Sequence, residues 1–244
     1  MNKELIKTRF RRKLSSYNDN ARIQKQMAER LIGFIQSTEK QNFGEILEIG
    51  CGTGLLTELA VNKFNFSNYT ALDIVPECEN YIKDIHSKIE FISSDIEEYI
   101  ETSDKTYDLI ISNASLQWVE NLPDFIKKLT KKLNPSGKLL FSTFGKENFR
   151  EIYYVLGKTL NYYSKKELSN IFADYIPIIE EEVRIMAFDN PKDVLKHIQS
   201  TGVNAILSES WTKRDLVSFE KEYNAFCFNR PTLTYNPIYV FITK

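Results

Sequence analysis

An acid and three glycines stand at alternate positions in the run EIGCGTG, which extends from Glu48 to Gly54. The apolar residues before this run predict a buried strand, and the helical spacing of apolar residues in 55–64 predicts a helix directly after it. Glycines in such a turn permit positive φ and let a ligand approach the backbone closely. The start of the helix adds free N–H groups. We therefore expect a cofactor site here, with an ordinary tight turn as the alternative.

A second acid, Asp73, ends the predicted strand 69–73 and lies 25 residues after Glu48. This separation fits one β-α-β unit, so both acids are expected at the carboxyl edge of one parallel sheet. A carboxylate at the end of the second strand can accept hydrogen bonds from both ribose hydroxyls of an adenosine. A helix N-cap or a surface acid is the alternative for this residue.

The spacing Glu48-x-Gly50-x-Gly52-x-Gly54 resembles motif I of the class I S-adenosylmethionine (SAM) methyltransferases. It differs from the dinucleotide-binding pattern, whose third glycine would fall on Leu55. A phosphate-binding loop of the Walker type is excluded, because no Gly-Lys-Ser/Thr follows.

The same resemblance implies an adenine site after the predicted strand 89–92. Asp95 would accept a hydrogen bond from the exocyclic amine of adenine, which a carboxylate complements, and Ile96 would lie against the ring. A helix cap is the alternative for Asp95. The cofactor-binding residues that we predict are Glu48, Gly50, Cys51, Gly52, Gly54, Asp73, Ile74, Asp95, Ile96 and Asn113.

These residues need a frame that brings several strand ends together. The run 107–113 is nearly all apolar, as in a strand buried on both faces, and it delivers Asn113 to the carboxyl edge. We expect an α/β fold of the Rossmann-like class I methyltransferase type, a seven-stranded, mostly parallel sheet with helices on both faces. The predicted strands are 46–49, 69–73, 89–92, 107–113, 138–144, 181–188 and 237–243, and the predicted helices are 55–64, 124–133, 191–200 and 213–223, with a break at 134–137.

The composition predicts a single domain over residues 1–244. Apolar residues make up 42% and charged residues 27% of the chain, as in soluble globular proteins. No apolar stretch is long enough to span a membrane, and the charged N-terminus lacks the apolar core of a secretion signal. Cys51, Cys78 and Cys227 are too widely spaced for a metal cluster and fit a reducing cytoplasm. For Cys51, packing among glycines is favoured over a reactive thiol.

Positive charge is concentrated at the N-terminus, where residues 1–30 carry a formal charge of +6 against about −7 for the remainder. This asymmetry indicates an acidic partner, with a solvated helix face as the alternative. Apolar residues recur with helical spacing in 21–37, and the resemblance implies that this helix covers the cofactor as a lid. The tyrosine-rich segment 145–180 is expected to be helical and to form an inserted cap, or else an aromatic core.

Further segments resemble the malonyl-[acyl-carrier-protein] O-methyltransferases of biotin synthesis, and the resemblance runs nearly end to end. These segments are Tyr17-Asn18-x-x-Ala21-x-Ile23-Gln24-x-Gln26-x-Ala28, Ser112-Asn113-x-x-x-Gln117-Trp118, Gly202-Val203-Asn204 and Leu233-Thr234-Tyr235. The chain departs from many members at Asn236, where they have histidine, so no role is carried over to that position. The resemblance implies methyl transfer from SAM to the free carboxylate of a malonyl-loaded acyl carrier protein or of malonyl-CoA.

Such a reaction needs little acid–base chemistry from the chain. His86 and His197 lie in predicted helices outside the motifs, and no Ser/His/Asp set or zinc spacing is present. A carboxylate has a free pKa near ~4 and is already ionised at neutral pH. We expect Tyr17, Gln117 and Trp118 to close the catalytic pocket around it, with core packing as the alternative. The residues expected to dock the acidic carrier protein or its thioester are Arg9, Arg11, Arg12, Arg22 and Arg150.

Two other functions stay open at this point. A methyltransferase for a free small acid, such as an aconitate-like substrate, would need no basic docking surface. A non-catalytic SAM-binding protein would bind SAM without a methyl acceptor. Nucleic acid is disfavoured as a substrate, because no Asn-Pro-Pro-Tyr-type motif is present and the net charge of −1 is not basic.

Overall fold

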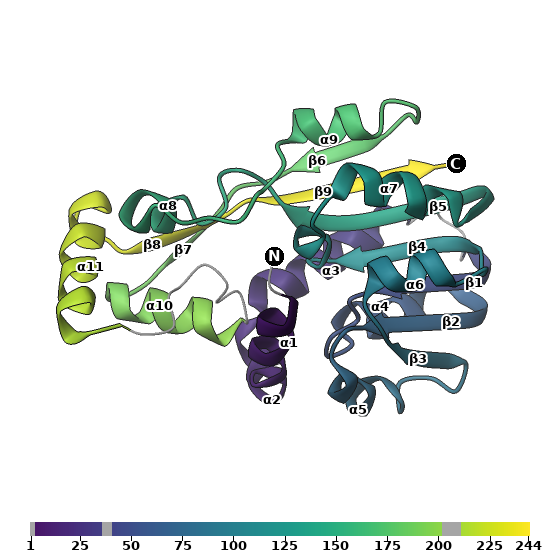
Figure 1. Ribbon diagram of the computed structural model, residues 1–244, viewed down its shortest axis with the longest axis horizontal. Coiled ribbons are helices and arrows are strands. Elements are labelled where there is room, and N and C mark those ends of the chain that lie inside the picture. Colours follow the sequence, from purple (N-terminus) through teal and green to yellow (C-terminus); the bar gives the residue numbers. More distant parts are fainter. Residues whose placement is uncertain (1–2, 36–40, 202–210) are drawn as a thin grey trace.

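The computed structural model describes residues 3–35, 41–201 and 211–244 (Figure 1). The Gly202-Val203-Asn204 segment of the family resemblance therefore lies outside the described residues. The strands are β1 (Asn42–Ile49), β2 (Asn65–Asp73), β3 (Ile89–Ser93), β4 (Tyr107–Asn113), β5 (Leu133–Phe144), β6 (Ile178–Glu181), β7 (Arg184–Ala187), β8 (Thr232–Tyr235) and β9 (Pro237–Thr243). Seven of them form one sheet in the order β3-β2-β1-β4-β5-β9-β6, and β7 pairs with β8 in a separate ribbon.

The main sheet is mostly parallel, as the sequence predicts. Neighbouring strands from β3 to β5 pair in parallel, and β9 inserts antiparallel between β5 and β6. The chain reverses its direction of winding between β1 and β4, which are neighbours in space. In open α/β sheets, ligands bind at the carboxyl ends of the strands at such a switch point.

Helices cover both faces of this sheet, and β4 shows why. Its buried residues alternate between two cores: Leu109 and Ile111 pack in the core beneath α3 and α4, whereas Ile110 packs beneath α6, α7 and α9. The helices in the described parts of the chain are α1 (Lys3–Arg11), α2 (Leu14–Asn20), α3 (Arg22–Gly33), α4 (Leu55–Lys63), η1 (Pro76–Cys78), α5 (Glu79–Ile82), α6 (Ile96–Thr102), η2 (Leu116–Trp118), α7 (Leu122–Lys131), α8 (Arg150–Leu156), α9 (Lys165–Ile171), α10 (Pro191–Ser200) and α11 (Lys213–Phe226).

The β7–β8 ribbon and the helices α8, α10 and α11 extend from one end of the sheet (Figure 1). Val194, Phe219 and Tyr223 of this extension belong to the same buried cluster as Ile46 of the sheet. The core therefore continues from the sheet into the extension, and a single domain remains our proposal for the chain. Among the described residues, none of the helices combines the length and the apolar character that crossing a bilayer requires.

The predicted strand 181–188 is wrong, because the chain changes sheets within it. Residues up to Glu181 pair with β9, and residues from Arg184 pair with β8. Asn236, at the bend between β8 and β9, donates its side-chain N–H groups to Glu181 Oε1 at 3.1 Å and to the Glu182 carbonyl at 2.9 Å. These bonds hold the crossing point, and they give Asn236 a structural role. The strand β8 and the short helices α1 and α2 were not predicted.

Three smaller expectations are also corrected. The predicted break at 134–137 lies inside β5, where a register shift opposite Tyr107 accommodates the turn residues. The helix expected over 21–37 ends at Gly33, before the undescribed residues begin. His86 lies in the loop between α5 and β3 rather than in a helix.

The segment 145–180 is less helical than predicted, since it holds only α8, α9 and the first residues of β6. The segment matches neither of the two predicted alternatives, an inserted cap or an aromatic core, in full. Tyr162 is buried, whereas Tyr153 and Tyr154 are 52% and 66% exposed. None of its described residues lines the cavities at the carboxyl edge of the sheet, so the structure gives no support to a cap over the site.

Candidate active site

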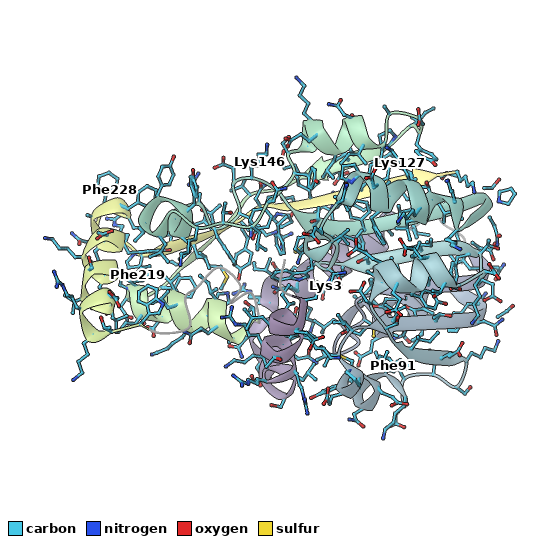
Figure 2. All side chains as sticks on the ribbon, viewed as in Figure 1. Lys3, Phe91, Lys127, Lys146, Phe219 and Phe228 are labelled. Atoms are coloured by element: carbon cyan, nitrogen blue, oxygen red, sulfur yellow. The ribbon has the colours of Figure 1, made fainter. Side chains whose placement is uncertain are left out.

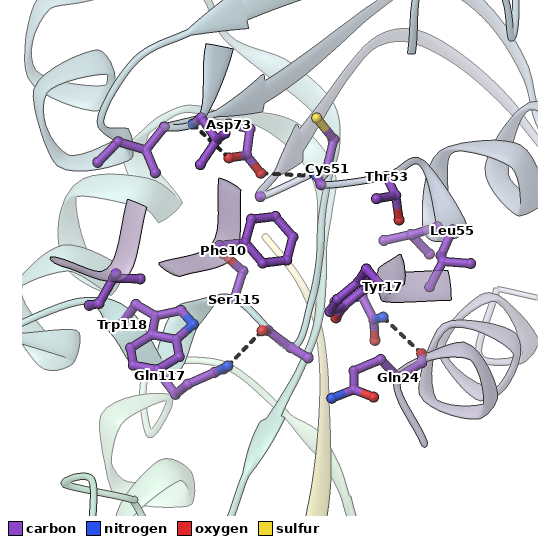
Figure 3. A pocket seen from close by; sticks show the side chains of 18 of the residues that line it. Phe10, Tyr17, Gln24, Cys51, Thr53, Leu55, Asp73, Ser115, Gln117 and Trp118 are labelled. Carbon is purple, nitrogen blue, oxygen red and sulfur yellow. Dashed lines mark hydrogen bonds between the residues drawn. The ribbon is translucent and has the colours of Figure 1, made fainter. Parts of the chain in front are cut away.

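A cavity opens at the carboxyl edge of the sheet, where the loops after β1, β2 and β4 face α1, α2 and α3 (Figure 3). It holds about 870 Å³ of empty space, part of which is open to solvent. A second cavity of about 580 Å³ adjoins it and shares several of its lining residues. The predicted residues in the first cavity are Tyr17, Glu48, Gly50, Cys51, Gly52, Asp73, Ile74, Asn113, Gln117 and Trp118, and Asp95 and Ile96 line the second. Gly54 lines neither cavity and instead caps the start of α4.

The glycine loop has a left-handed backbone at which side chains would be strained and crowded. Gly50 and Gly52 have φ values of +68° and +54°. A Cβ atom on Gly50 would lie 2.6 Å from the Cβ of Ser115, and one on Gly52 would lie 3.3 Å from the ring of Phe10 on α1. Gly52 lines the cavity, so a side chain at this position would take up space that a ligand can fill.

Asp73 fixes this loop against the end of β2. Its Oδ2 accepts a hydrogen bond from the Gly52 N–H at 2.9 Å, and its Oδ1 accepts one from the Val75 N–H at 2.9 Å. The side chain is buried and lines both cavities, so the alternative of a surface acid is wrong. Burial raises the pKa of Asp73, and the two backbone hydrogen bonds oppose that rise.

Cys51 lies in the same loop and is buried. Burial, followed by the charges of Asp73 and Glu48, raises the pKa of its thiol. The thiolate that a reactive cysteine needs is therefore disfavoured, which supports packing as the reason for this residue.

Glu48 is a buried carboxyl at the end of β1. Its Oε2 accepts hydrogen bonds from the Thr57 hydroxyl at 2.6 Å and from the Tyr69 hydroxyl at 2.5 Å. Burial raises the pKa of Glu48 to about 7, and the nearby Asp73 adds to the rise. A carboxyl that titrates near neutral pH can become ionised when a cationic ligand enters beside it.

This raised pKa makes the stability of the protein depend on pH. Because the folded protein holds the Glu48 proton more tightly than the unfolded chain, the free energy of unfolding falls as pH rises from about 4.5 to above 7. The total loss is on the order of 3 kcal/mol. We expect Glu48→Gln to be more stable than wild type at pH 8 but similar at pH 5, in urea unfolding monitored by circular dichroism.

Glu58→Gln provides the control for this measurement, because Glu58 is an exposed acid on the next helix. It should keep the wild-type dependence of stability on pH. Parallel curves for wild type and Glu48→Gln between pH 5 and pH 8 would contradict the role given to Glu48.

Asp95 is both a helix cap and a lining residue of the second cavity. Its Oδ1 accepts from the Glu97 N–H at 2.8 Å at the start of α6, as the cap alternative expects. Its Oδ2 forms a salt bridge with Lys3 Nζ at 2.6 Å, and Lys3 also contacts Glu97 Oε2 at 2.5 Å. The helix α1 thereby covers this cavity, together with its Ile6 side chain.

Asn113 lines the first cavity, but its side-chain amide is committed to the fold. Its Nδ2 donates to the carbonyl of Gln24 at 3.0 Å, and its Oδ1 accepts from the Ser142 hydroxyl at 2.6 Å. These bonds tie α3 to β4 and β5. Asn113 therefore lies where a cofactor-binding residue is expected, but the contacts of its side chain hold α3 and the strands in place.

Tyr17, Gln117 and Trp118 lie together in the first cavity, and none of them is fully buried. Tyr17 packs edge-on against Phe10, with ring centroids 5.1 Å apart. Its enclosed position, with the charge of Asp73 nearby, raises the pKa of its hydroxyl, which keeps the proton available for donation. Gln117 already donates from Nε2 to the Ala114 carbonyl at 2.6 Å.

The sequence prediction missed the part of α1 that lines the site. Lys3, Ile6, Lys7 and Phe10 contribute to the two cavities. Their spacing of three, four and seven residues places them on one face of a helix, and this signal could have been found. The helical pattern extends over only eight residues, and the many basic residues in 1–13 made it hard to recognise.

The predicted docking residues are not all on one surface. Arg11 pairs with Glu77 at 2.7 Å, whereas Arg12, directly after α1, and Arg22, at the start of α3, are exposed. Arg9 is half-buried on α1. Arg150 lies on α8, where it pairs with Glu147 at 3.4 Å, away from both cavities.

Comparison with known proteins identifies the type of fold and of enzyme. The family model described as "Methyltransferase domain" matches residues 23–175. The chain is 39% identical over 241 residues to a malonyl-[acyl-carrier protein] O-methyltransferase of Calditerrivibrio nitroreducens, covering 98% of this chain and 96% of that protein. It is 36% identical to the protein of the same name from Chlorobium luteolum, covering 99% and 95% of the two chains.

Solved structures with low sequence identity share the fold. The N-methyltransferase NodS of Bradyrhizobium japonicum, solved in complex with S-adenosyl-L-homocysteine, matches with a TM-score of 0.55 and 15% identity over 98% of each chain. A cyclopropane-fatty-acyl-phospholipid synthase-like protein of Lactobacillus casei matches with a TM-score of 0.57 and 15% identity, covering 91% of this chain and 92% of that one.

Proposed function

The chain belongs to the malonyl-[acyl-carrier protein] O-methyltransferases, SAM-dependent enzymes of the class I fold, and we propose that it methylates the free carboxylate of a malonyl thioester. The observation that carries this proposal is the cavity at the switch point, with acids at the strand ends and a wall of neutral amides and aromatic rings. The thioester is that of an acyl carrier protein, with malonyl-CoA as the smaller alternative.

The residues at the carboxyl edge fit SAM as the cofactor. The cavity-facing side of Gly52 leaves space beside the loop that a Cβ atom would fill. Asp73 is placed to accept from ribose hydroxyls, and Asp95 and Ile96 line the adjoining cavity that suits adenine. Burial raises the pKa of Glu48 to about 7, so Glu48 can ionise beside the positive charge of the cofactor.

When bound, SAM supplies a methyl group that its sulfonium has already activated. The chain's task is to hold the carboxylate oxygen in line with that methyl at ~3–3.5 Å and to exclude water. A carboxylate lone pair forms the new bond, the old bonding pair leaves with sulfur, and no proton moves. None of the described residues that line the cavity is a histidine, and this reaction needs no base.

Methylation would change how other enzymes accept the malonyl group. Burying an unpaired carboxylate in a protein costs on the order of several kcal/mol. An apolar chain-elongation channel would therefore reject malonate and accept its methyl ester. We propose that the product primes the pimeloyl chain of biotin, and that the reaction occurs in the cytoplasm, where the free cysteines of this chain would stay reduced.

A methyl-transfer assay tests this function directly. The purified chain and SAM are offered malonyl-carrier protein, malonyl-CoA, free malonate and free aconitate in separate reactions. We expect turnover with the malonyl thioesters and methyl ester in the product. Turnover only with a free acid would identify a small-acid methyltransferase, and SAM binding without any turnover would identify a non-catalytic SAM-binding protein.

The same assay tests whether an acidic carrier protein docks beside α1. Lys3 and Lys7 line the cavities, so reversing them would disturb the site itself. Arg11 is paired with Glu77, so reversing it would also break an ion pair. Reversal of the exposed Arg12 and Arg22 to glutamate avoids both problems. We expect KM for malonyl-carrier protein to rise about tenfold or more at low salt, and less as salt increases, because screening acts within ~10 Å at 0.1 M.

Reversal of Lys127 and Lys131 on α7 provides a control with the same change in charge. Lys127 lies apart from Lys3 and its helix (Figure 2). This control should keep the wild-type KM for malonyl-carrier protein. If the Arg12 and Arg22 reversal also keeps it at low salt, the docking surface lies elsewhere.

A further inference from the structure

Gln24 on α3 is a buried amide that the fold leaves without a partner. The residue is 2% exposed and lines the first cavity. Its Oε1 is sealed from solvent and has no hydrogen-bond partner, and its Nε2 makes no hydrogen bond within the described part of the chain. Buried polar groups are nearly always hydrogen-bonded. The sealed Oε1 is an acceptor and cannot bind an anion, but Nε2 is a donor that is not sealed from solvent, so Nε2 is the end of the amide that a ligand in the cavity can complete.

The position of this amide is imposed by the surrounding fold. The carbonyl of Gln24 accepts from Asn113 Nδ2 at 3.0 Å, and Asn113 is held in turn by Ser142. The neighbours Ile23 and Met27 are buried in the core. Since α3 cannot rotate without breaking these contacts, an apolar residue at position 24 would pack more easily than glutamine.

The polar groups of the cavity are divided between its two ends. Asp73 and Cys51 lie at one end in Figure 3, and the amides of Gln24 and Gln117 lie at the other, with Tyr17 between them. The acidic end suits the positive charge of the cofactor. The amide end can donate N–H groups, which suits an anion.

We propose that Gln24 binds the reacting carboxylate of the substrate, with Nε2 donating to the oxygen that is not methylated. This inference rests on the proposed function and adds a specificity-determining residue to it. A neutral donor fits the reaction better than a cation does. The carboxylate loses its negative charge during methyl transfer, so a cation beside it would stabilise the ground state more than the transition state.

Among the described residues, Lys7 on α1 is the cation that lines the same cavity. Its side chain comes from α1 and is half-exposed, whereas Gln24 on α3 is 2% exposed and held by the core. We therefore assign orientation of the carboxylate to the fixed amide of Gln24 and not to this lysine.

Two variants and one inhibitor test the assignment. Gln24→Leu should fold with an equal or higher melting temperature, because it removes an unpaired buried polar group. Its kcat/KM for malonyl thioester should fall by about tenfold or more. Gln24→Glu places a like charge beside the carboxylate and should lower kcat/KM by about a hundredfold or more. SAM affinity, measured by calorimetry, should change little in both variants.

An acetyl thioester serves as the inhibitor, because it lacks the carboxylate but keeps the remainder of the substrate. Its inhibition constant should stay at the wild-type value in both variants. A matched control is Gln26→Leu on the same helix, since Gln26 bonds Arg184 and lines neither cavity. This control should retain wild-type turnover.

The outcomes separate the inference from the proposed function. If wild type does not methylate a malonyl thioester, the proposed function fails before any variant is compared. If wild type does so and Gln24→Leu matches it in kcat/KM, the role of Gln24 is overturned while the function stands. Equal losses of malonyl turnover and of acetyl-thioester binding would also overturn the role, because they would indicate a general distortion of the cavity.

Discussion

Replacement of Asp73 by alanine is expected to raise the Kd for SAM by about a hundredfold or more. The variant removes the acceptor proposed for the ribose hydroxyls, and charge-assisted hydrogen bonds are worth ~1.5–3 kcal/mol each. At ~1.4 kcal/mol per tenfold change, two such bonds account for at least a factor of one hundred. The variant also frees the N–H groups of Gly52 and Val75, which Asp73 now holds at 2.9 Å. Isothermal titration calorimetry measures the change.

Asp108→Ala is a matched control for this loss. Asp108 also accepts from two backbone N–H groups, those of Gly44 at 2.7 Å and Glu45 at 3.0 Å. It lies at the start of β4, at the opposite edge of the sheet from the cavity. We expect Asp108→Ala to lose some stability and to keep the wild-type affinity for SAM. Similar SAM affinities in wild type and Asp73→Ala would place the ribose contact elsewhere.

The sequence was sufficient to predict the parallel part of the sheet and the carboxyl ends of its strands β1 to β4. Each β-α unit is local in the chain, and the runs before Gly50 and Asp73 are apolar enough to identify buried strands. Because parallel strands share one carboxyl edge, the residues after them had to meet there. Their meeting in two adjoining cavities follows from the topology, without knowledge of any side-chain contact.

Other features depend on contacts between distant segments, which no local pattern contains. Asn113 was predicted to contact the cofactor because it ends a strand, but its amide bonds Gln24 and Ser142, 89 and 29 residues away. The crossing of the chain from β6 to β7 is held by Asn236, 54 residues from Glu182. The covering of the second cavity by α1 depends on Lys3 and Asp95, which are far apart in the chain.

The glycine loop offers a second variant with a large expected effect. Gly50→Ala should lower SAM affinity by about a hundredfold or more, because two costs combine at this position. The left-handed backbone at φ +68° costs an L-residue roughly 1–2 kcal/mol. The new Cβ would also lie 2.6 Å from the Cβ of Ser115, so the loop or the start of η2 must shift. Both border the cofactor cavity.

Two further variants separate strain from steric overlap. Gly157 ends α8 with a similar φ of +64°, but a Cβ there would meet nothing within 4 Å. Gly157→Ala should therefore show a modest loss of stability and wild-type SAM affinity. Gly50→Ala combined with Ser115→Gly removes the overlap and keeps the strain, so it should recover part of the lost affinity. A folded Gly50→Ala protein with the wild-type Kd would mean that the loop does not form the cofactor site, since a displaced loop could not leave that affinity unchanged.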